Sequence, residues 1–424
     1  MAPSSPTADL GDIDLTDLDR FADGFPHDAF DRLRRDAPVW FHPPTEHTPE
    51  AEGFWVLSRH ADIAAAAADA EGLSSDGSGC RATGGGTLIE DLPGGFAAGV
   101  LLNMMDDPRH LRIRRLLAPS VTPRALAAME PGLRARAEAI VGDAVARGEV
   151  DFLTEVALEL PLQALAQLIG VPQQDRLELF GWANANLDLD DHDLGESTDR
   201  TVAASAAMFA YATDLIADRR RCPADDLMSI AATATIPTGP ADAPGPEEPL
   251  TDLEVQMLFN LLIAAGSETT RNSVAGGILA FCRHPDQWEA LRRDRTLLGT
   301  AVEEILRFTS STTYNRRTAT RDLVIGGHQI RRGDKVTLWW PSADHDEAVF
   351  SDPHRFDVAR DEGRHLAFGH GSHFCLGAQL ARLEIRLLLE ALLDRVAGFE
   401  LTGPPEWTRS NKHTGLRHLP IRFT

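Results

Sequence analysis

Residues 368–384 of the chain read FGHGSHFCLGAQLARLE. In this stretch, Cys375 stands between a glycine-rich run and an apolar helical pattern. Glycine permits positive φ and close approach of a bulky group to the backbone, and free N–H groups at a helix start favour a thiolate. A flat cofactor could therefore lie against this loop, and an ionised sulfur at Cys375 could bind a metal. A buried structural cysteine remains an alternative, and zinc held with His370 and His373 is disfavoured because no second Cys/His pair follows.

The composition narrows the class of protein. The chain has 424 residues, 43% of them hydrophobic and 25% charged, with a formal net charge of -23. This balance predicts a folded, soluble protein and argues against nucleic acid or a membrane surface as partner. The four cysteines form no CxxC pair, and the N-terminus lacks a basic segment followed by an apolar one, so we expect a cytoplasmic location.

Periodicity predicts a mainly α fold with small antiparallel β-sheets. Residues 1–20 read as a mobile tail, and 124–220 as a set of helices broken at Pro131 among other positions. Thr251 and Glu254 form a capping box, so a helix should run from 252 to about 283, roughly 45 Å long. Short strands are expected near 323–340. The Gly- and Ser-rich loop from about 74 to 99 is a candidate pocket wall.

The cysteine stretch closely resembles the haem-binding loop of the cytochrome P450 monooxygenases. The resemblance implies a triangular prism with a long central helix over the haem. It also implies one catalytic domain over 21–424, β-rich near 35–60 and 315–345. Cys375 would be the thiolate ligand of the iron in haem b, with Phe368 over the haem near the sulfur and His373 reaching a propionate. The glycines of the loop carried over from the family are Gly369 and Gly377.

A second matching segment is EEILR, in which Glu304 and Arg307 would share a helix face. An isolated pair of this kind is usually a surface ion pair. Its position some 70 residues before the cysteine resembles the family pattern, as does FSDPHRF between them. The resemblance implies that Arg355 completes a buried Glu-Arg-Arg network with a structural role.

The third segment, AAGSETT on the long predicted helix, resembles the oxygen-binding segment of the family. Gly266 would permit close approach of the porphyrin, and the Thr269 hydroxyl can bond to the carbonyl of Ala265 and loosen the helix. Glu268 could then pass protons toward the bound oxygen. The alternative, a solvated acidic face, is weakened by the apolar run that precedes it.

Buried haem propionates require cations, and the resemblance places three here: His110, Arg114 and Arg317. Around the cysteine, Arg112, Arg115 and Arg382 could form a basic patch for an acidic ferredoxin.

The pocket wall by resemblance is mostly apolar, with some hydroxyls, which suggests a bulky hydrophobic substrate with a polar end. Its candidate residues are Leu262, Ile263, Thr312, Thr313, Tyr314 and His413. The expected function is a monomeric monooxygenase that inserts one atom of O2 into a terpenoid, steroid or polyketide-like molecule. Ferredoxin and ferredoxin reductase would supply the electrons. A peroxide-driven peroxygenase and a haem sensor or carrier are the alternatives, and neither would need Glu268 and Thr269.

Overall fold

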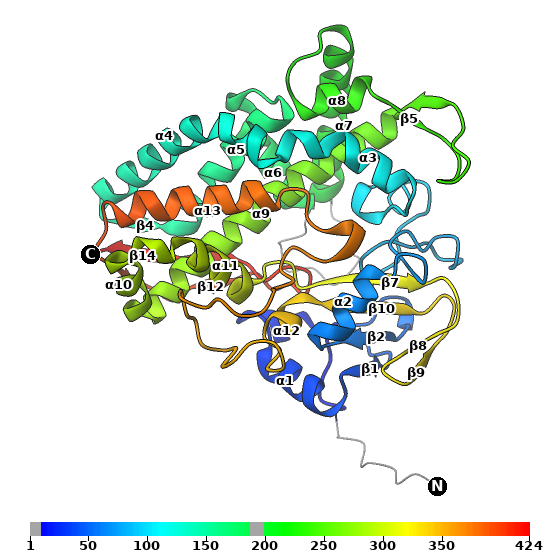
Figure 1. The fold of residues 1–424 in the computed structure, drawn as a ribbon, viewed down its shortest axis with the longest axis horizontal. Coiled ribbons are helices and arrows are strands. Elements are labelled where there is room, and N and C mark those ends of the chain that lie inside the picture. Colours follow the sequence, from blue (N-terminus) through cyan, green and yellow to red (C-terminus); the bar gives the residue numbers. More distant parts are fainter. Residues whose placement is uncertain (1–9, 187–198) are drawn as a thin grey trace.

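The computed structural model describes residues 10–186 and 199–424 and is dominated by helices. Figure 1 shows most helices gathered on one side of the molecule and the largest sheet on the other. The helices are α1 (His27–Asp36), α2 (His60–Ala68), α3 (Arg109–Leu117), α4 (Pro123–Arg147), α5 (Glu159–Ile169), α6 (Arg176–Asn186), α7 (Asp199–Arg221), α8 (Leu227–Thr233), α9 (Asp252–Arg283), α10 (Pro285–Arg293), α11 (Leu298–Thr309), α12 (Trp340–Asp344) and α13 (Ala378–Leu393).

Helix α9 is the central element of the fold. The Thr251 hydroxyl accepts the backbone N–H of Glu254, and the Glu254 carboxylate accepts the N–H of Thr251, so the predicted capping box is confirmed. From this start the helix continues through 32 residues, about 48 Å, and contacts α5, α7, α11 and α13. It is buried along most of its C-terminal half because apolar faces of several helices close around it.

The largest sheet has the strand order β1-β2-β10-β7-β3. Its strands are β1 (Val39–His42), β2 (Phe54–Leu57), β3 (Leu73–Ser74), β7 (Tyr314–Ala319) and β10 (Lys335–Trp339). Pairing is antiparallel throughout except between β2 and β10, which are parallel. The two β-rich ranges predicted from the sequence therefore meet in one sheet.

Smaller sheets lie at other points of the chain. A three-stranded sheet has the order β11-β14-β4, and three two-stranded hairpins are present in the described residues. The strands are β4 (Glu149–Asp151), β5 (Thr235–Pro237), β6 (Glu247–Pro249), β8 (Leu323–Ile325), β9 (His328–Ile330), β11 (Phe399–Leu401), β12 (Glu406–Trp407), β13 (Leu416–His418) and β14 (Pro420–Phe423). Several of these strands lie outside the two ranges that the sequence marked as β-rich.

The mobile tail predicted for residues 1–20 is wrong for residues 10–20. Leu10, Ile13 and Leu15 are buried in a cluster that includes Trp339, and the Leu15 N–H donates to Nε2 of His42 at 2.9 Å. Spaced apolar residues in a polar segment were enough to pack it onto the sheet. Residues 1–9 lie outside the described part of the chain.

Pro131 does not break a helix, contrary to the expectation from sequence. It lies inside α4, which continues for sixteen residues beyond it to Arg147. Leu133, Ala137 and Val141 of this second part are fully buried, so packing outweighs the missing hydrogen bond and the clash that proline causes.

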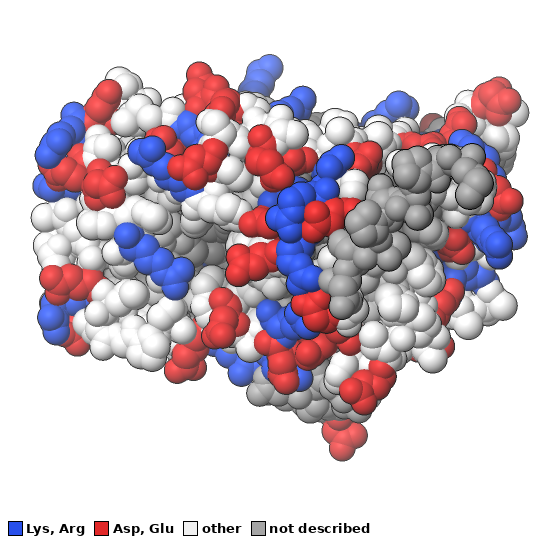
Figure 2. Space-filling model, turned by 90° about the horizontal axis from the view of Figure 1, so that it is seen from below, with Lys and Arg blue, Asp and Glu red and all other residues white. Residues whose placement is uncertain are grey.

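The surface carries many charges of both signs. Acidic and basic side chains lie interspersed on the face seen in Figure 2, consistent with 64 acidic against 41 basic residues. Among the helices that the structure describes, none contains a stretch both long and apolar enough to cross a bilayer.

Candidate active site

The loop before α13 holds Cys375 by a short backbone bond. The Cys375 N–H donates to the Phe368 carbonyl at 2.8 Å, and the Phe374 N–H donates to that of Gly371 at 3.1 Å. Gly371 has φ of +73°, and a Cβ there would lie 2.4 Å from the Ala67 carbonyl oxygen of α2. Glycine is therefore required at this position by both backbone conformation and space.

Cys375 is exposed, and it lines a large cavity. Burial raises its pKa, whereas the backbone N–H groups of Gly377 and Ala378 and the charges of Arg114 and Arg382 act in the opposite direction. The start of α13 thus favours the thiolate, as expected, but does not outweigh burial. A bound cation beside the sulfur would complete the stabilisation of the anion.

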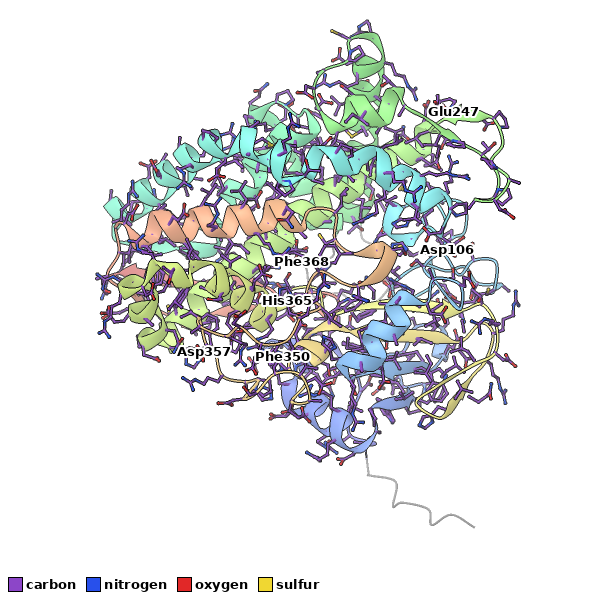
Figure 3. All side chains as sticks on the ribbon, viewed as in Figure 1. Asp106, Glu247, Phe350, Asp357, His365 and Phe368 are labelled. Atoms are coloured by element: carbon purple, nitrogen blue, oxygen red, sulfur yellow. The ribbon has the colours of Figure 1, made fainter. Side chains whose placement is uncertain are left out.

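Phe368 lines the same cavity as Cys375, and its place over the haem stays a prediction. Figure 3 labels it on the segment between α12 and α13. The guanidinium carbon of Arg382 is 4.6 Å from its ring centroid, and that guanidinium forms an ion pair with Glu303 at 2.7 Å. Gly369 and Gly377 line the same cavity.

A cluster of basic side chains, two arginines and two histidines, lies at one side of the cavity. His110 stacks on His373 with ring centroids 3.9 Å apart, and Nε2 of His373 is 3.1 Å from the Ser75 hydroxyl. Burial and the charges of Arg317, His110 and Arg114 lower the pKa of His373 to about 2. Burial lowers the pKa of Arg317 to about 10. It also lowers the pKa of Arg114. These groups form one site from α3, β7 and the cysteine loop.

Counter-charge for this cluster is scarce. Within residues 10–186 and 199–424, no carboxylate forms an ion pair with Arg114 or Arg317. The Arg317 side chain donates only to a backbone carbonyl, that of Arg316, at 2.9 Å. Asp106, labelled in Figure 3, is the one carboxylate that acts on Arg317, and it is bonded to Ser74 and Ser75. The cluster is built to receive anionic groups from the cavity.

The cavity has a volume of about 720 Å³ and is lined mainly by apolar side chains. From α9 it receives Leu261, Ala264, Ala265, Gly266 and Thr269. The loop predicted to form a wall contributes Leu88, Leu92, Phe96 and Ala97, among others.

Two of the predicted wall residues on α9 face the protein instead. Ile263 is buried in a core cluster and Leu262 packs against the same cluster, whereas Leu261 and Ala264 face the cavity. Successive helix residues point about 100° apart, so an assignment that is off by one position selects the wrong face. These two predictions are therefore wrong.

Three of the four remaining wall predictions are consistent with the cavity. Thr312 and His413 line it and pair as an isolated β-bridge. Tyr314 also lines it, but its hydroxyl is engaged, accepting the N–H of Ile89 at 3.2 Å. Thr313 is fully buried and donates to the carbonyl of Asn411, so its prediction is wrong because strand alternation turns it away.

Helix α9 places Thr269 at the cavity and Glu268 outside its lining. The Thr269 hydroxyl donates to the Ala265 carbonyl at 2.8 Å, the bond expected from sequence. Both carboxylate oxygens of Glu268 are buried without a hydrogen-bond partner, and one lies 3.6 Å from Arg271. The space that a Cβ at Gly266 would need is taken by Leu165, 3.0 Å away, so this glycine first accommodates a protein side chain.

Glu384 is a cavity residue that sequence reasoning missed. It lies on α13 and lines the cavity, and burial raises its pKa to about 8, although a hydrogen bond with Thr270 acts in the opposite direction. In the sequence, Glu384 stands between Leu383 and Ile385 in an apolar run. A carboxylate in such a run is the signal that could have indicated a buried, functional residue.

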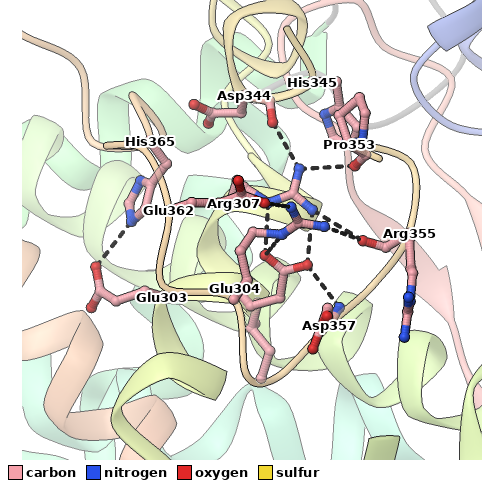
Figure 4. A network of polar contacts seen from close by, with 12 residues as sticks. Glu303, Glu304, Arg307, Asp344, His345, Pro353, Arg355, Asp357, Glu362 and His365 are labelled. Carbon is pink, nitrogen blue, oxygen red and sulfur yellow. Dashed lines mark hydrogen bonds and ion pairs between the residues drawn. The ribbon is translucent and has the colours of Figure 1, made fainter. Parts of the chain in front are cut away.

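The predicted Glu-Arg-Arg network exists with a different third member. Arg307 forms two bonds to Glu304, of 2.7 and 2.8 Å, and donates to the carbonyls of Asp344 and Pro353. The second guanidinium on Glu304 belongs to Arg360, at 3.1 Å. Arg355 is exposed and contributes only its backbone carbonyl, with its side chain turned away (Figure 4). The prediction of Arg355 is therefore wrong.

Comparison with known proteins identifies the arrangement. The family model described as Cytochrome P450 matches residues 186–416. The chain belongs to the cytochrome P450 family. It is 47% identical over 417 residues to cytochrome P450 126 of Mycobacterium tuberculosis, with 98% of each chain covered.

Other relatives in the family carry names that state an activity. The chain is 36% identical to a steroid C26-monooxygenase of Rhodococcus jostii, covering 97% of this chain and 84% of the relative. It is 35% identical to the linalool 8-monooxygenase of Pseudomonas putida, covering 96% and 98%. A Mycobacterium marinum cytochrome P450 solved with pseudoionone matches with a TM-score of 0.86 at 32% identity, covering both chains in full.

The chain is accordingly a cytochrome P450 monooxygenase with haem b as its cofactor. The residues present fit that group, since a cavity-facing cysteine lies near Arg114 and Arg317, two arginines that form no ion pair among the described residues. Cys375 would hold the iron, and the cluster of His110, Arg114, Arg317 and His373 would receive the two propionates. When bound, haem with a thiolate ligand activates O2 so that one oxygen atom is transferred to the substrate.

Proposed function

We propose that the substrate is a bulky, mostly hydrophobic molecule of terpenoid, steroid or polyketide-like type, bound with a polar end. The observation that carries the proposal is the cavity of about 720 Å³ with mainly apolar walls. Haem would take the part beside Cys375 and the cluster of basic side chains. The substrate is then left the part between α9 and the wall formed by Leu88, Phe96 and Ala97.

The polar end would lie against the strand that follows α11. Thr312 and His413 face the cavity there, and Lys412 lines it while its ammonium pairs with Glu90 at 2.6 Å. Hydroxyl and imidazole groups suit a neutral oxygen function, since the one cation nearby already has a carboxylate partner. The names of relatives that act on steroids and linalool support this class.

We further propose that Thr269 and Glu268 supply protons for the reaction. The Thr269 hydroxyl is at the cavity, within reach of a bound ligand, while its bond to Ala265 marks a loosened turn of α9. Glu268 would turn from Arg271 toward this hydroxyl. Neither carboxylate oxygen has a hydrogen bond to give up, and the 3.6 Å ion pair with Arg271 is the contact that this rotation would lose.

Electrons would come from a ferredoxin and its reductase. Of the three arginines predicted for docking, Arg115 is exposed, Arg382 is paired with Glu303, and Arg112 donates to carbonyls of the β5–β6 hairpin region. Arg115 is thus the best-placed docking cation of the three. A monomeric state and a cytoplasmic location stay predictions from composition.

The test begins with the purified, haem-loaded protein. Steroids, acyclic and cyclic terpenoids and polyketide lactones would be titrated while the haem absorption band is followed, because a substrate that displaces bound water shifts that band. Binding members would then be turned over with ferredoxin, reductase, reduced nicotinamide and ¹⁸O2. We expect one labelled oxygen atom in the product. Tight binding of only small polar ligands, or product formed with hydrogen peroxide but never with the ferredoxin system, would contradict the proposal.

A further inference from the structure

Three histidines from separate segments of the chain lie close together. His27 is the first residue of α1, His345 follows α12, and His354 lies in the chain between Pro353 and Phe356. One ring nitrogen of each lies within 4.8 Å of one from both others. The ring centroids are 4.1 Å apart for His27 and His345, 5.4 Å for His27 and His354, and 5.3 Å for His345 and His354.

The hydrogen bonds of these rings leave one nitrogen on each available. Nδ1 of His345 is bonded to the Pro341 carbonyl at 2.9 Å, so its N–H is placed there and Nε2 keeps a lone pair. Nε2 of His354 is 3.0 Å from the Asp31 carboxylate, which leaves Nδ1. Nδ1 of His27 is buried without a partner. A carbonyl and a carboxylate behind the rings are the outer partners typical of metal-bound histidines.

The surroundings of His27 and His345 keep these two rings neutral. Burial, with the charges of His354, Arg34 and Arg307, lowers the pKa of His27 to about 3, and burial holds that of His345 well below its usual value. Neutral imidazole is the form that binds metals.

The two nearby guanidinium groups are already balanced by carboxylates. Arg34 pairs with Asp31 and with Glu347, and Arg307 pairs with Glu304. The electrostatic repulsion between these two guanidinium groups and a bound metal ion is therefore weakened by their carboxylate partners.

We propose that His27, His345 and His354 form a binding site for a divalent transition metal of the zinc type. Three imidazoles plus a water molecule make a common tetrahedral set, with metal–nitrogen distances of about 2.0–2.1 Å and nitrogens about 3.4 Å apart. The distances between the ring nitrogens, which are up to 4.8 Å here, must therefore shorten by up to about 1.4 Å on binding. His354 can supply the movement, since its side chain is 44% exposed on a loop.

The consequence of binding would be structural. The metal would join α1, the end of α12 and the loop that carries the Pro353 carbonyl, to which Arg307 donates at 2.9 Å. A ligand that binds the folded state alone stabilises it, so zinc should raise the unfolding temperature without acting at the haem.

This site differs from the other group of possible ligands among the described residues. Glu50, Glu52 and Asp91 also lie within 4.8 Å of one another. Their charges are already met by Lys335, 2.9 Å from Glu50, and by Arg81, 2.8 Å from Asp91. The acidic group carries no proposal.

The test uses the haem-loaded full chain without a histidine tag. Equilibrium dialysis against micromolar Zn²⁺, with metal content measured by mass spectrometry, should give about one zinc per chain above that of His354→Ala. We expect His354→Ala to bind at least about tenfold more weakly and to lose the zinc-dependent rise in unfolding temperature. His47→Ala is the matched control, because the His47 side chain is 43% exposed and lies outside the cluster.

His354→Ala should fold, since it removes an exposed side chain, and its haem spectrum and circular dichroism would verify this. Equal zinc content and equal thermal shift in the wild type and His354→Ala would overturn the site. So would the absence of any zinc retained by the wild type.

Discussion

The guanidinium of Arg360 donates to the carboxylate of Glu304 at 3.1 Å. It completes a buried network in which Glu304 also receives the N–H of Asp357 at 2.9 Å. These two contacts hold the segment around residues 357–360, which precedes the cysteine loop, against α11.

Arg360→Ala should therefore destabilise the protein. Removing one charged hydrogen-bond partner of a buried carboxylate costs about 1.5–3 kcal/mol, while Arg307 still holds Glu304. Arg355→Ala is the matched control and should change the free energy of unfolding by no more than about 0.5 kcal/mol, because that side chain is exposed. Denaturant unfolding of the two haem-loaded variants measures both. Equal losses would show that the network does not depend on the Arg360 side chain.

Arg317→Gln should have opposite effects on the haem-loaded and haem-free forms. Without haem, Arg317 is a buried cation whose charge depresses the pKa of His373, so its removal should leave the haem-free protein as stable or more so. With haem, it loses a propionate partner and should bind haem at least about tenfold more weakly. Haem transfer to an acceptor protein and thermal unfolding of both forms provide the readouts. Unchanged haem affinity would remove Arg317 from the propionate site.

Glu384→Gln should change how stability depends on pH. The folded-state pKa of about 8 lies above the usual value of 4.5, so the folded protein holds a proton that the unfolded chain releases between these values. Wild-type stability should then fall, relative to Glu384→Gln, by up to about 1.4 kcal/mol per pH unit from pH 5 to pH 8, and level off above. Unfolding curves of both proteins at several pH values test this. A constant difference across that range would mean that Glu384 titrates normally.

Thr269→Ala should separate electron use from product formation. If the hydroxyl delivers protons, its loss should lower the product formed per reduced nicotinamide, with the rate of product formation down about tenfold or more. Ser273→Ala is the control, since Ser273 also lines the cavity and donates to a backbone carbonyl, that of Thr269, at 3.0 Å. Product and nicotinamide measured together give the ratio. Equal coupling in all three proteins would contradict the relay.

Local signals in the sequence account for the parts that were predicted correctly. The capping box of Thr251 and Glu254 acts within one turn, and the positive φ angles of Gly369 and Gly371 belong to the local backbone of the cysteine loop. Such features depend on neighbours in the chain, and so they can be interpreted before any contact is known.

The tertiary structure decided which of several similar residues contacts Glu304 and which residues of α9 line the cavity. Arg355 and Arg360 are equivalent cations in one loop, yet only Arg360 reaches Glu304. On α9, Leu261 faces the cavity whereas the predicted Leu262 and Ile263 do not, because the rotation of α9 is set by the helices packed around it.

Short continuous motifs in the sequence were therefore sufficient to predict the family and the start of the central helix, and they carry the prediction that Cys375 is the haem ligand. Only the tertiary structure decided which arginine completes the network, which side chains form the pocket, and that His27, His345 and His354 meet. Those outcomes depend on segments brought together over hundreds of residues, where packing rather than local pattern sets each side chain's neighbours.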